Sequence, residues 1–302
     1  MVDIGKLLNQ KSNTMLSLII CSRTSRISEE LEKNISETIG CEYELVVIDN
    51  SKNKYSIFSA YNEGVRRAQG NNLCFMHDDI LYKTNDWGTK VEKMLENESI
   101  GIIGVIGSYV MTKDYGYWDM MAPWVTGCVP LTNKSGWNGK NNCDFYFDNN
   151  SSNEVAAVDG MWYCMSKRIF SKIRFDEETY SGFHFYDMDI CMQSLMVGYK
   201  NVIMREVEIV HYCYPQYNYQ YVQAMKKFFT KWDENLPIYK GEAIGMSEKE
   251  YTRLYDSTKQ YCRLLDKYTF YKNDIENSLS YKLGNAIAEP YRKIVRLLKR
   301  QK

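Results

Sequence analysis

The chain has 302 residues, 44% of them hydrophobic, which is enough for a buried core in one large domain or in one domain with an appendage. Lysine plus arginine and aspartate plus glutamate each number 38, so no overall charge attracts the chain to nucleic acid. Nine scattered cysteines without a Cys-x-x-Cys motif argue against a disulfide framework or a thiolate zinc site and predict reduced thiols.

Between residues 15 and about 108 the chain alternates between apolar strands and helices. We expect strands at 16–21, at 44–49, from Leu73 and at 100–105, and helices ending near residues 39, 68 and 95. Ser28 can cap the first helix, whose Leu31 and Ile35 share one face. Apolar strands alternating with helices predict an α/β fold with a mainly parallel central sheet flanked by helices.

Polar residues follow three of these strands, at the point where each strand ends. The three groups are Ser22 with Arg23, Asp49 with Asn50 and Ser51, and His77 with Asp78 and Asp79. Ligands of such folds bind beyond the carboxyl ends of the strands, so we expect one shared site. Carboxylates and an imidazole there suit a divalent cation such as Mn2+ or Mg2+, whereas an aspartate pair that starts a turn is the alternative interpretation.

The segment from residue 109 to residue 153 is rich in glycine, asparagine and aromatic residues and has no sustained period, which predicts a long, partly ordered excursion. Its rings either stack on sugar faces or pin the excursion to the domain. They are Tyr115, Tyr117, Trp118, Trp124, Trp137, Phe145, Tyr146 and Phe147.

A strand pattern returns at 155–165, interrupted by Asp159–Gly160. A helix that stops near Gly198 follows, with Asp187 and Asp189 at its start, where the helix dipole favours carboxylates. Two short strands then lead to His211.

After about residue 216 the chain reads as helical and polar, so we expect an N-terminal extension at 1–14, a catalytic domain at 15–215 and a helical region at 216–302. The last segment, 290–302, is basic and amphipathic. Such a helix can lie on an anionic membrane surface, or pack on its own domain or on a second subunit as a homo-oligomer.

The order of these motifs resembles the inverting glycosyltransferases of family 2, which have the GT-A fold, in the branch typified by the streptomycin-biosynthesis glycosyltransferase-like domain. The motifs are Val-Ile-Asp-Asn-Ser, His-Asp-Asp, Val-Asp-Gly-x-Trp, Phe-Asp-Glu and Phe-His-Phe-Tyr-Asp-Met-Asp, then Gly-Tyr and a late histidine. The likeness covers roughly residues 15 to 215.

The resemblance implies a role for each matching residue. A nucleotide-sugar pocket would be lined by Ser22, Arg23, Asp49, Asn50 and Asp78, and a divalent metal would be held by Asp79, His211 and His77. Asp187 would be the catalytic base, and the acceptor pocket would contain Asp159, Gly160, Trp162 and His184. Two residues depart from the family pattern: His77 replaces the first aspartate of its Asp-x-Asp motif, and Tyr186 replaces the glutamate before its catalytic aspartate.

The implied activity is transfer of a sugar from a nucleotide-diphosphate sugar, with a UDP-sugar favoured, to a hydroxyl of a glycan or lipid-linked glycan in polysaccharide or glycoconjugate synthesis. A catalytically silent nucleotide- or glycan-binding module is one alternative. A nucleotidyltransferase is another, although no Gly-rich phosphate loop follows the first strand. We expect a cytoplasmic protein, peripheral to the inner membrane face if the basic tail binds lipid, because no leader pattern is present and the longest apolar stretch, 100–111, is too short for a span.

Overall fold

The computed structural model describes residues 15–113, 116–117, 124–127, 153–212, 217–286 and 288–289. The predictions for the N-terminal extension, for the basic segment 290–302 and for most of the aromatic residues of the 109–153 excursion lie outside these described residues. Of those aromatic residues, Tyr117 and Trp124 are described.

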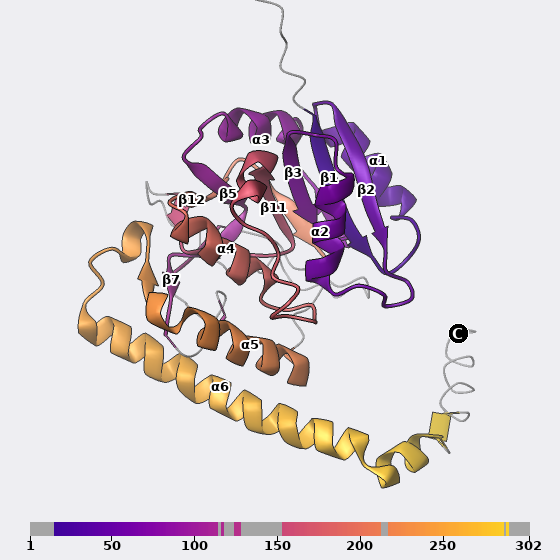
Figure 1. The fold of residues 1–302 in the computed structure, drawn as a ribbon, viewed down its shortest axis with the longest axis vertical. Helices are drawn as coiled ribbons and strands as arrows, with labels where there is room; N and C mark the ends of the chain where they lie inside the picture. Colours follow the sequence, from indigo (N-terminus) through magenta and orange to yellow (C-terminus); the bar gives the residue numbers. More distant parts are fainter. Residues whose placement is uncertain are drawn as a thin grey trace, which may run out of the picture.

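A seven-stranded sheet forms the centre of the fold, in the order β2-β1-β3-β11-β5-β12-β9 (Figure 1). Strands β2, β1, β3, β5 and β12 run in one direction, while β11 and β9 run in the other. The mainly parallel sheet predicted from the sequence is therefore confirmed. The bounds are β1 Leu16–Ser22, β2 Tyr43–Asp49, β3 Asn72–Met76, β5 Ile100–Gly104, β9 Glu154–Val155, β11 Trp162–Ser166 and β12 Lys200–Ile203.

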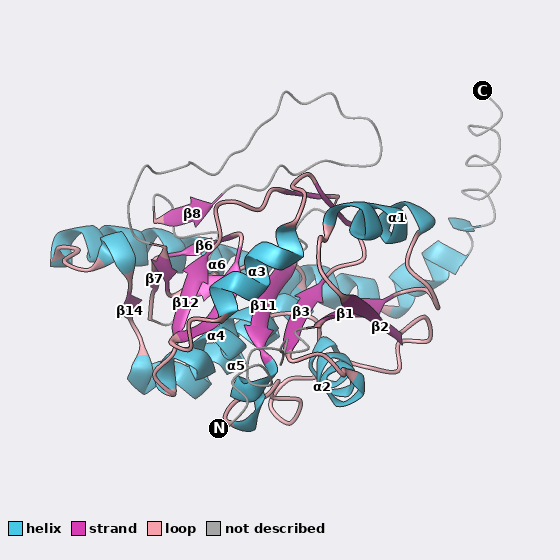
Figure 2. Cartoon of the chain, turned by 90° about the horizontal axis from the view of Figure 1, so that it is seen from above, coloured by secondary structure: helices cyan, strands magenta, loops and turns pink. Residues whose placement is uncertain are grey.

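Helices cover both faces of this sheet, as Figure 2 shows, with α1 and α3 on one face and α2 and α4 on the other. Their bounds are α1 Glu29–Thr38, α2 Ile57–Arg67, α3 Trp87–Leu95 and α4 Tyr186–Met196. The Ser28 hydroxyl accepts a hydrogen bond from the Leu31 amide at 3.2 Å, so the predicted cap of α1 is confirmed. Strand β3 is buried along its whole length, because it lies in the middle of the sheet between the two helix layers.

Short strands outside the main sheet shape its carboxyl edge. β4 (Ile80–Tyr82) pairs with β13 (Ile209–His211), and β6 (Ile106–Ser108) lies between β8 (Val125–Gly127) and β10 (Ala157–Val158). The interruption expected at Asp159–Gly160 is confirmed, since it separates β10 from β11. A strand that the sequence did not indicate, β14 (Ile238–Tyr239), pairs with β7 (Val110–Met111), because pairs of two residues carry no detectable period.

Helix α5 (Tyr219–Trp232) packs against the domain that contains the central sheet. Its Val222, Met225 and Phe228 belong to the same hydrophobic core as the strands of that sheet. Three short 3-10 helices follow β11, α5 and β14 in the chain: η3 (Lys167–Ser171), η4 (Asp233–Asn235) and η5 (Gly241–Ala243). Helix α6 (Glu248–Asn277) runs along α5 and extends beyond it (Figure 1). The division of the chain at residue 216 stays a prediction.

Within the described ranges, no helix is both long enough and apolar enough to cross a bilayer. No disulfide joins cysteines in that same part of the chain.

Candidate active site

The carboxyl ends of β1, β2 and β3 meet at one edge, and polar side chains gather there. Ser22 pairs in register with Asp49 on the neighbouring strand. The Ser22 hydroxyl donates to Asp78 Oδ2 at 2.8 Å, and Arg23 Nη2 lies 3.6 Å from Asp78 Oδ1. The structure thus brings Ser22, Arg23 and Asp78 into direct contact, although the Arg23 side chain remains 81% exposed and free to reach a ligand.

Asp49 and Asn50 have different environments at this edge. Asp49 is exposed, and its Oδ1 accepts a hydrogen bond from the Ser51 amide at 2.9 Å. Hydrogen bonds from the Ser51 hydroxyl and from the Ser51 amide lower the pKa of Asp49. Asn50 is buried, and its amide donates to the Tyr55 carbonyl and accepts from the Tyr55 N–H. Asp49 is therefore available to a ligand, while Asn50 holds the loop that follows β2.

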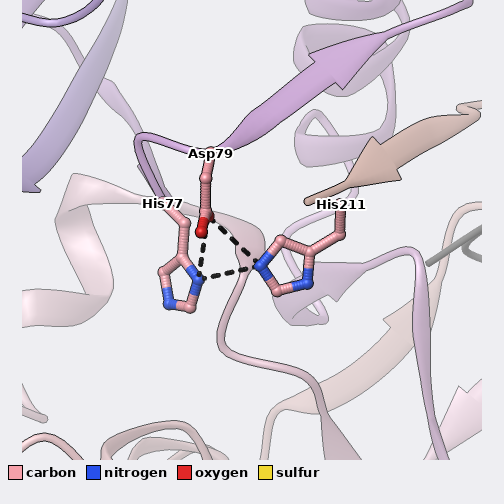
Figure 3. A group of neighbouring side chains, drawn as sticks. All are labelled: His77, Asp79 and His211. Atoms are coloured by element: carbon pink, nitrogen blue, oxygen red, sulfur yellow. Dashed lines mark hydrogen bonds and ion pairs between the residues drawn. The ribbon is translucent and has the colours of Figure 1, made fainter. Parts of the chain in front are cut away.

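Three side chains at the edge, those of His77, Asp79 and His211, point their possible metal-ligand atoms toward one another (Figure 3). His211 Nε2 lies 3.2 Å from Asp79 Oδ1 and 3.3 Å from His77 Nδ1, and His77 Nδ1 lies 3.9 Å from Asp79 Oδ1. Together they offer two imidazole nitrogens and one carboxylate oxygen to a single point.

The β4–β13 pair explains how His211 reaches this cluster from far along the chain. In its antiparallel register His211 stands opposite Ile80, and the Tyr212 amide donates to the Asp79 carbonyl at 2.9 Å. His77 is held from the other side, because its amide donates to the Met161 carbonyl next to β11. Both backbones are therefore fixed by sheet-like hydrogen bonds.

The chemistry of the cluster fits a divalent cation. Asp79 Oδ1 is buried, and apart from the nearby imidazoles of His211 and His77 it has no hydrogen-bond partner among the described residues. Burial alone would raise the pKa of Asp79, but the imidazoles of His211 and His77 outweigh it and lower the pKa to about 2. An ionised carboxylate beside two imidazoles is a ligand set for ions such as Mn2+, so the cluster could hold a metal.

Asp187 lies in the first turn of α4 and is fully buried. Its Oδ2 accepts hydrogen bonds from the Tyr117 hydroxyl and from the Gly160 amide, the latter at 2.9 Å, and its Oδ1 accepts from the Met188 amide. Burial, reinforced by the negative charge of Asp159, raises the pKa of Asp187 to about 7 despite these donors. A carboxylate with this pKa can accept a proton near neutral pH.

The turn between β10 and β11 connects Asp187 with the metal-ligand cluster. Asp159 Oδ1 accepts a hydrogen bond from the Met161 amide at 2.7 Å, which closes the turn around Gly160. A Cβ atom on Gly160 would lie 2.3 Å from the Tyr186 hydroxyl oxygen, so only glycine fits beside that ring. The Tyr186 hydroxyl in turn lies 2.8 Å from His77 Nε2.

The other two predicted acceptor residues, Trp162 and His184, pack against aromatic rings. Trp162 is fully buried in the core, where its ring packs edge-on against Trp87, so we do not include it in the proposed acceptor pocket. The His184 ring packs edge-on against Tyr221 of α5. Burial lowers the pKa of His184, against a smaller opposing effect of Asn218.

Sequence reasoning missed two contacts of this site. Tyr117 belongs to the aromatic excursion, and nothing near it in sequence indicates a hydrogen bond to Asp187, which is 70 positions away. Tyr186 departs from the family pattern, but its contact with His77 spans 109 positions and leaves no trace in local sequence.

The family described as "Glycosyltransferase like family" matches residues 17–232, which is most of the chain and includes the whole site. The chain belongs to this glycosyltransferase-like family. The streptomycin biosynthesis protein StrF of Streptomyces griseus is 26% identical over 165 residues, covering 53% of this chain and 54% of StrF. The chain therefore spans about half the length of that curated relative.

Solved structures are similar to this chain in fold. The structure of GalNAc-T7 with UDP, GalNAc and Mn2+ superposes with a TM-score of 0.50 at 10% identity, covering 74% of this chain and 49% of GalNAc-T7. The mannosyltransferase PcManGT from Pyrobaculum calidifontis, in complex with GDP-Man and Mn2+, has a TM-score of 0.49 at 14% identity, covering 92% of this chain and 82% of that one. The GT-A fold predicted from the sequence is confirmed.

Proposed function

We propose that this protein is an inverting glycosyltransferase that moves a sugar from a nucleotide-diphosphate sugar to a hydroxyl group, with the help of a divalent cation. The observation that carries the proposal is that a possible metal site and a possible catalytic base lie close together. A metal-ligand cluster of His77, Asp79 and His211 is joined through Tyr186 to Asp187, a buried carboxylate whose pKa is about 7.

The donor would bind at the carboxyl ends of β1 to β3. The exposed Asp49 carboxylate can accept hydrogen bonds from a ribose, and Ser22 with Asp78 forms the floor beside it. The exposed Arg23 guanidinium can approach the phosphates, since Arg is suited to bind them. A UDP-sugar is the favoured donor, in keeping with the UDP in the GalNAc-T7 structure.

The metal site has a defined part in this reaction. A divalent cation held by His77, Asp79 and His211 would neutralise the charge that develops on the leaving diphosphate. Asp79, with its pKa near 2, stays ionised across the physiological range and keeps its oxygen available as a ligand.

Asp187 would act as the base. Its carboxylate accepts the proton of the acceptor hydroxyl while the acceptor oxygen forms a bond to the anomeric carbon, and the bond from that carbon to the diphosphate oxygen breaks with its electron pair leaving on the nucleotide. A single displacement inverts the configuration at the anomeric carbon. Because Asp187 is fully buried, the acceptor hydroxyl must take the place at Oδ2 that the Tyr117 hydroxyl occupies in this structure.

We further propose that the acceptor is a glycan or lipid-linked glycan bound near Asp159, Gly160 and His184, in polysaccharide or glycoconjugate synthesis in the cytoplasm. The support is the position of the Asp159–Gly160 turn directly beside Asp187.

The test is a screen of nucleotide sugars for release of the nucleoside diphosphate with purified protein. We expect turnover of at least one donor with Mn2+ or Mg2+, loss of turnover on chelation, and recovery when the metal is restored. Anomeric configuration of the product, read by NMR, should be inverted. Retention of configuration would contradict the single-displacement mechanism.

A silent binding module is the second candidate, favoured by the complete burial of Asp187 beneath Tyr117. Calorimetric titration with UDP, with and without Mn2+, separates the two candidates. Metal-dependent UDP binding without turnover of any donor in the panel would support the silent module.

A further inference from the structure

We propose that Tyr186 is a positioning residue of the metal centre: its hydroxyl accepts the Nε2 proton of His77, so that Nδ1 of the same ring faces the cation together with His211 and Asp79. This inference rests on the metal role in the proposed function. It concerns how the ligand set is oriented and can be tested without any sugar transfer.

The two nitrogens of the His77 ring face different partners. Nδ1 lies 3.3 Å from His211 Nε2, on the side of the metal-ligand cluster. Nε2 lies 2.8 Å from the Tyr186 hydroxyl oxygen, on the side of α4. A neutral imidazole carries one proton, and a nitrogen that binds a metal must offer its lone pair. Placing the proton on Nε2 therefore leaves Nδ1 free for the metal.

Packing fixes the Tyr186 side chain in this place. The residue is almost completely buried, and its ring meets Phe58 and Tyr61 edge-on at centroid distances of 6.3 and 5.7 Å. Gly160 lies against the hydroxyl end of the ring, where an added Cβ atom would lie 2.5 Å from Cζ. This close packing holds the ring in place, so its hydroxyl provides a well-positioned acceptor for the His77 proton.

The protonation state of Tyr186 suits this task. A tyrosine is a neutral phenol near neutral pH, because its ordinary pKa is about 10. A neutral phenol oxygen accepts a hydrogen bond from Nε2–H. It adds no negative charge next to Asp187.

The contact also joins the two positions at which this chain departs from the pattern of the family it resembles. His77 stands in place of an aspartate and Tyr186 in place of a glutamate, and these two residues touch each other. A histidine ligand needs a partner that sets its tautomer, which an aspartate ligand does not. The two departures therefore fit one arrangement, in which His77 supplies the ligand nitrogen and Tyr186 orients the His77 ring.

A centre with two nitrogen ligands has a metal preference. Imidazole binds Mn2+ and later transition ions better than Mg2+, which prefers an all-oxygen shell. We therefore expect this site to take Mn2+ in preference to Mg2+.

The test is a titration of the full chain with Mn2+ alone, with free Mn2+ followed by electron paramagnetic resonance. Tyr186→Phe should weaken Mn2+ binding by about 10- to 100-fold, the usual effect of removing a partner that orients a metal-bound histidine. The matched control is Tyr61→Phe, which removes a hydroxyl without a hydrogen-bond partner among the described residues from a ring in contact with Tyr186. This control should bind Mn2+ as the wild type does.

Two further readouts distinguish orientation from a general structural effect. In the His77→Ala background, Tyr186→Phe should cause no additional loss of Mn2+ affinity. The chain has only three histidines, so long-range nitrogen NMR of the Zn2+-loaded protein can resolve His77 and should show its proton on Nε2. The inference is wrong if Tyr186→Phe binds Mn2+ like Tyr61→Phe, or if the proton lies on Nδ1.

The outcome is separable from that of the proposed function. Normal metal binding in Tyr186→Phe, with donor turnover in the wild type, would overturn this inference alone. A wild type that binds Mn2+ through an oriented His77 but turns over no donor would leave this inference standing and contradict the transferase.

Discussion

The hydroxyl oxygen of Tyr186 lies 2.8 Å from Nε2 of His77, so the residue that precedes the buried Asp187 carboxylate also contacts a predicted metal ligand. The two halves of the proposed reaction, stabilising the leaving diphosphate and deprotonating the acceptor, are therefore connected by one side chain. A change in the position of Tyr186 should affect both halves together. A change in Asp187 alone should affect only the second.

Replacement of Asp187 by asparagine tests the base. Asp187→Asn keeps the size of the side chain and an oxygen that can accept from Gly160, but removes the proton acceptor. We expect turnover to fall by about 10²- to 10⁴-fold while UDP affinity by calorimetry stays nearly unchanged. Full activity of this variant would show that the base lies elsewhere.

The pH profile of kcat/KM should reveal the same carboxylate. Because the pKa of Asp187 is raised to about 7 and the base works only when ionised, the rate should rise as the pH increases through 7. The charge of Asp159 contributes to this raised pKa, so Asp159→Asn should move the rising limb to lower pH. The asparagine oxygen can still accept the hydrogen bond from Met161. A rising limb that does not move, or moves to higher pH, would refute the coupling.

Gly160→Ala should damage both halves of the site. The added methyl group would lie 2.3 Å from the Tyr186 hydroxyl oxygen, so the turn or the ring must shift, and the contact between Tyr186 and His77 is disturbed. Displacements of about 1 Å near reacting groups can cost about 100-fold in rate, and we expect a loss of that order in kcat/KM together with weaker Mn2+ binding. Gly182→Ala is the control, because a Cβ atom there meets nothing within 4 Å. Equal behaviour of the two variants would argue against a steric role for Gly160.

Helix α5 should depend on one ion-pair network for its attachment to α4. Lys231 Nζ lies 2.7 Å from both Asp176 Oδ2 and Asp189 Oδ1, and the Asp189 side chain is only 1% exposed. Lys231→Met leaves the Asp189 charge buried without its cation and should lower the free energy of unfolding by about 3 kcal/mol. Urea denaturation measures this value.

Lys227→Met is the matched control for that measurement. It removes a lysine one turn earlier on α5, whose Nζ donates to the exposed Thr179 carbonyl at 2.8 Å. We expect a change within about 0.5 kcal/mol, as for other surface substitutions. If both variants lose the same stability, the network does not attach α5.

Local patterns in the sequence were sufficient for the main elements of the fold. The apolar run from Leu16 to Cys21 is long enough for a strand and is found in β1, and Ser28 caps α1 as its position before an amphipathic run indicates. These features depend on residues close in sequence, so periodicity and capping chemistry reveal them. Trp162 shows the limit, because nothing local tells whether a ring after a turn faces the core or a ligand.

The sequence by itself determined which residue types stand at the strand ends, and hence that a carboxylate and imidazole site was to be expected near Asp79. Only the tertiary structure decided which of these residues meet. The antiparallel β4–β13 pair brings His211 to Asp79, and the turn before β11 places Gly160 between Asp187 and Tyr186. Such contacts join residues far apart in the chain, and their distances depend on strand order and register rather than on any local preference.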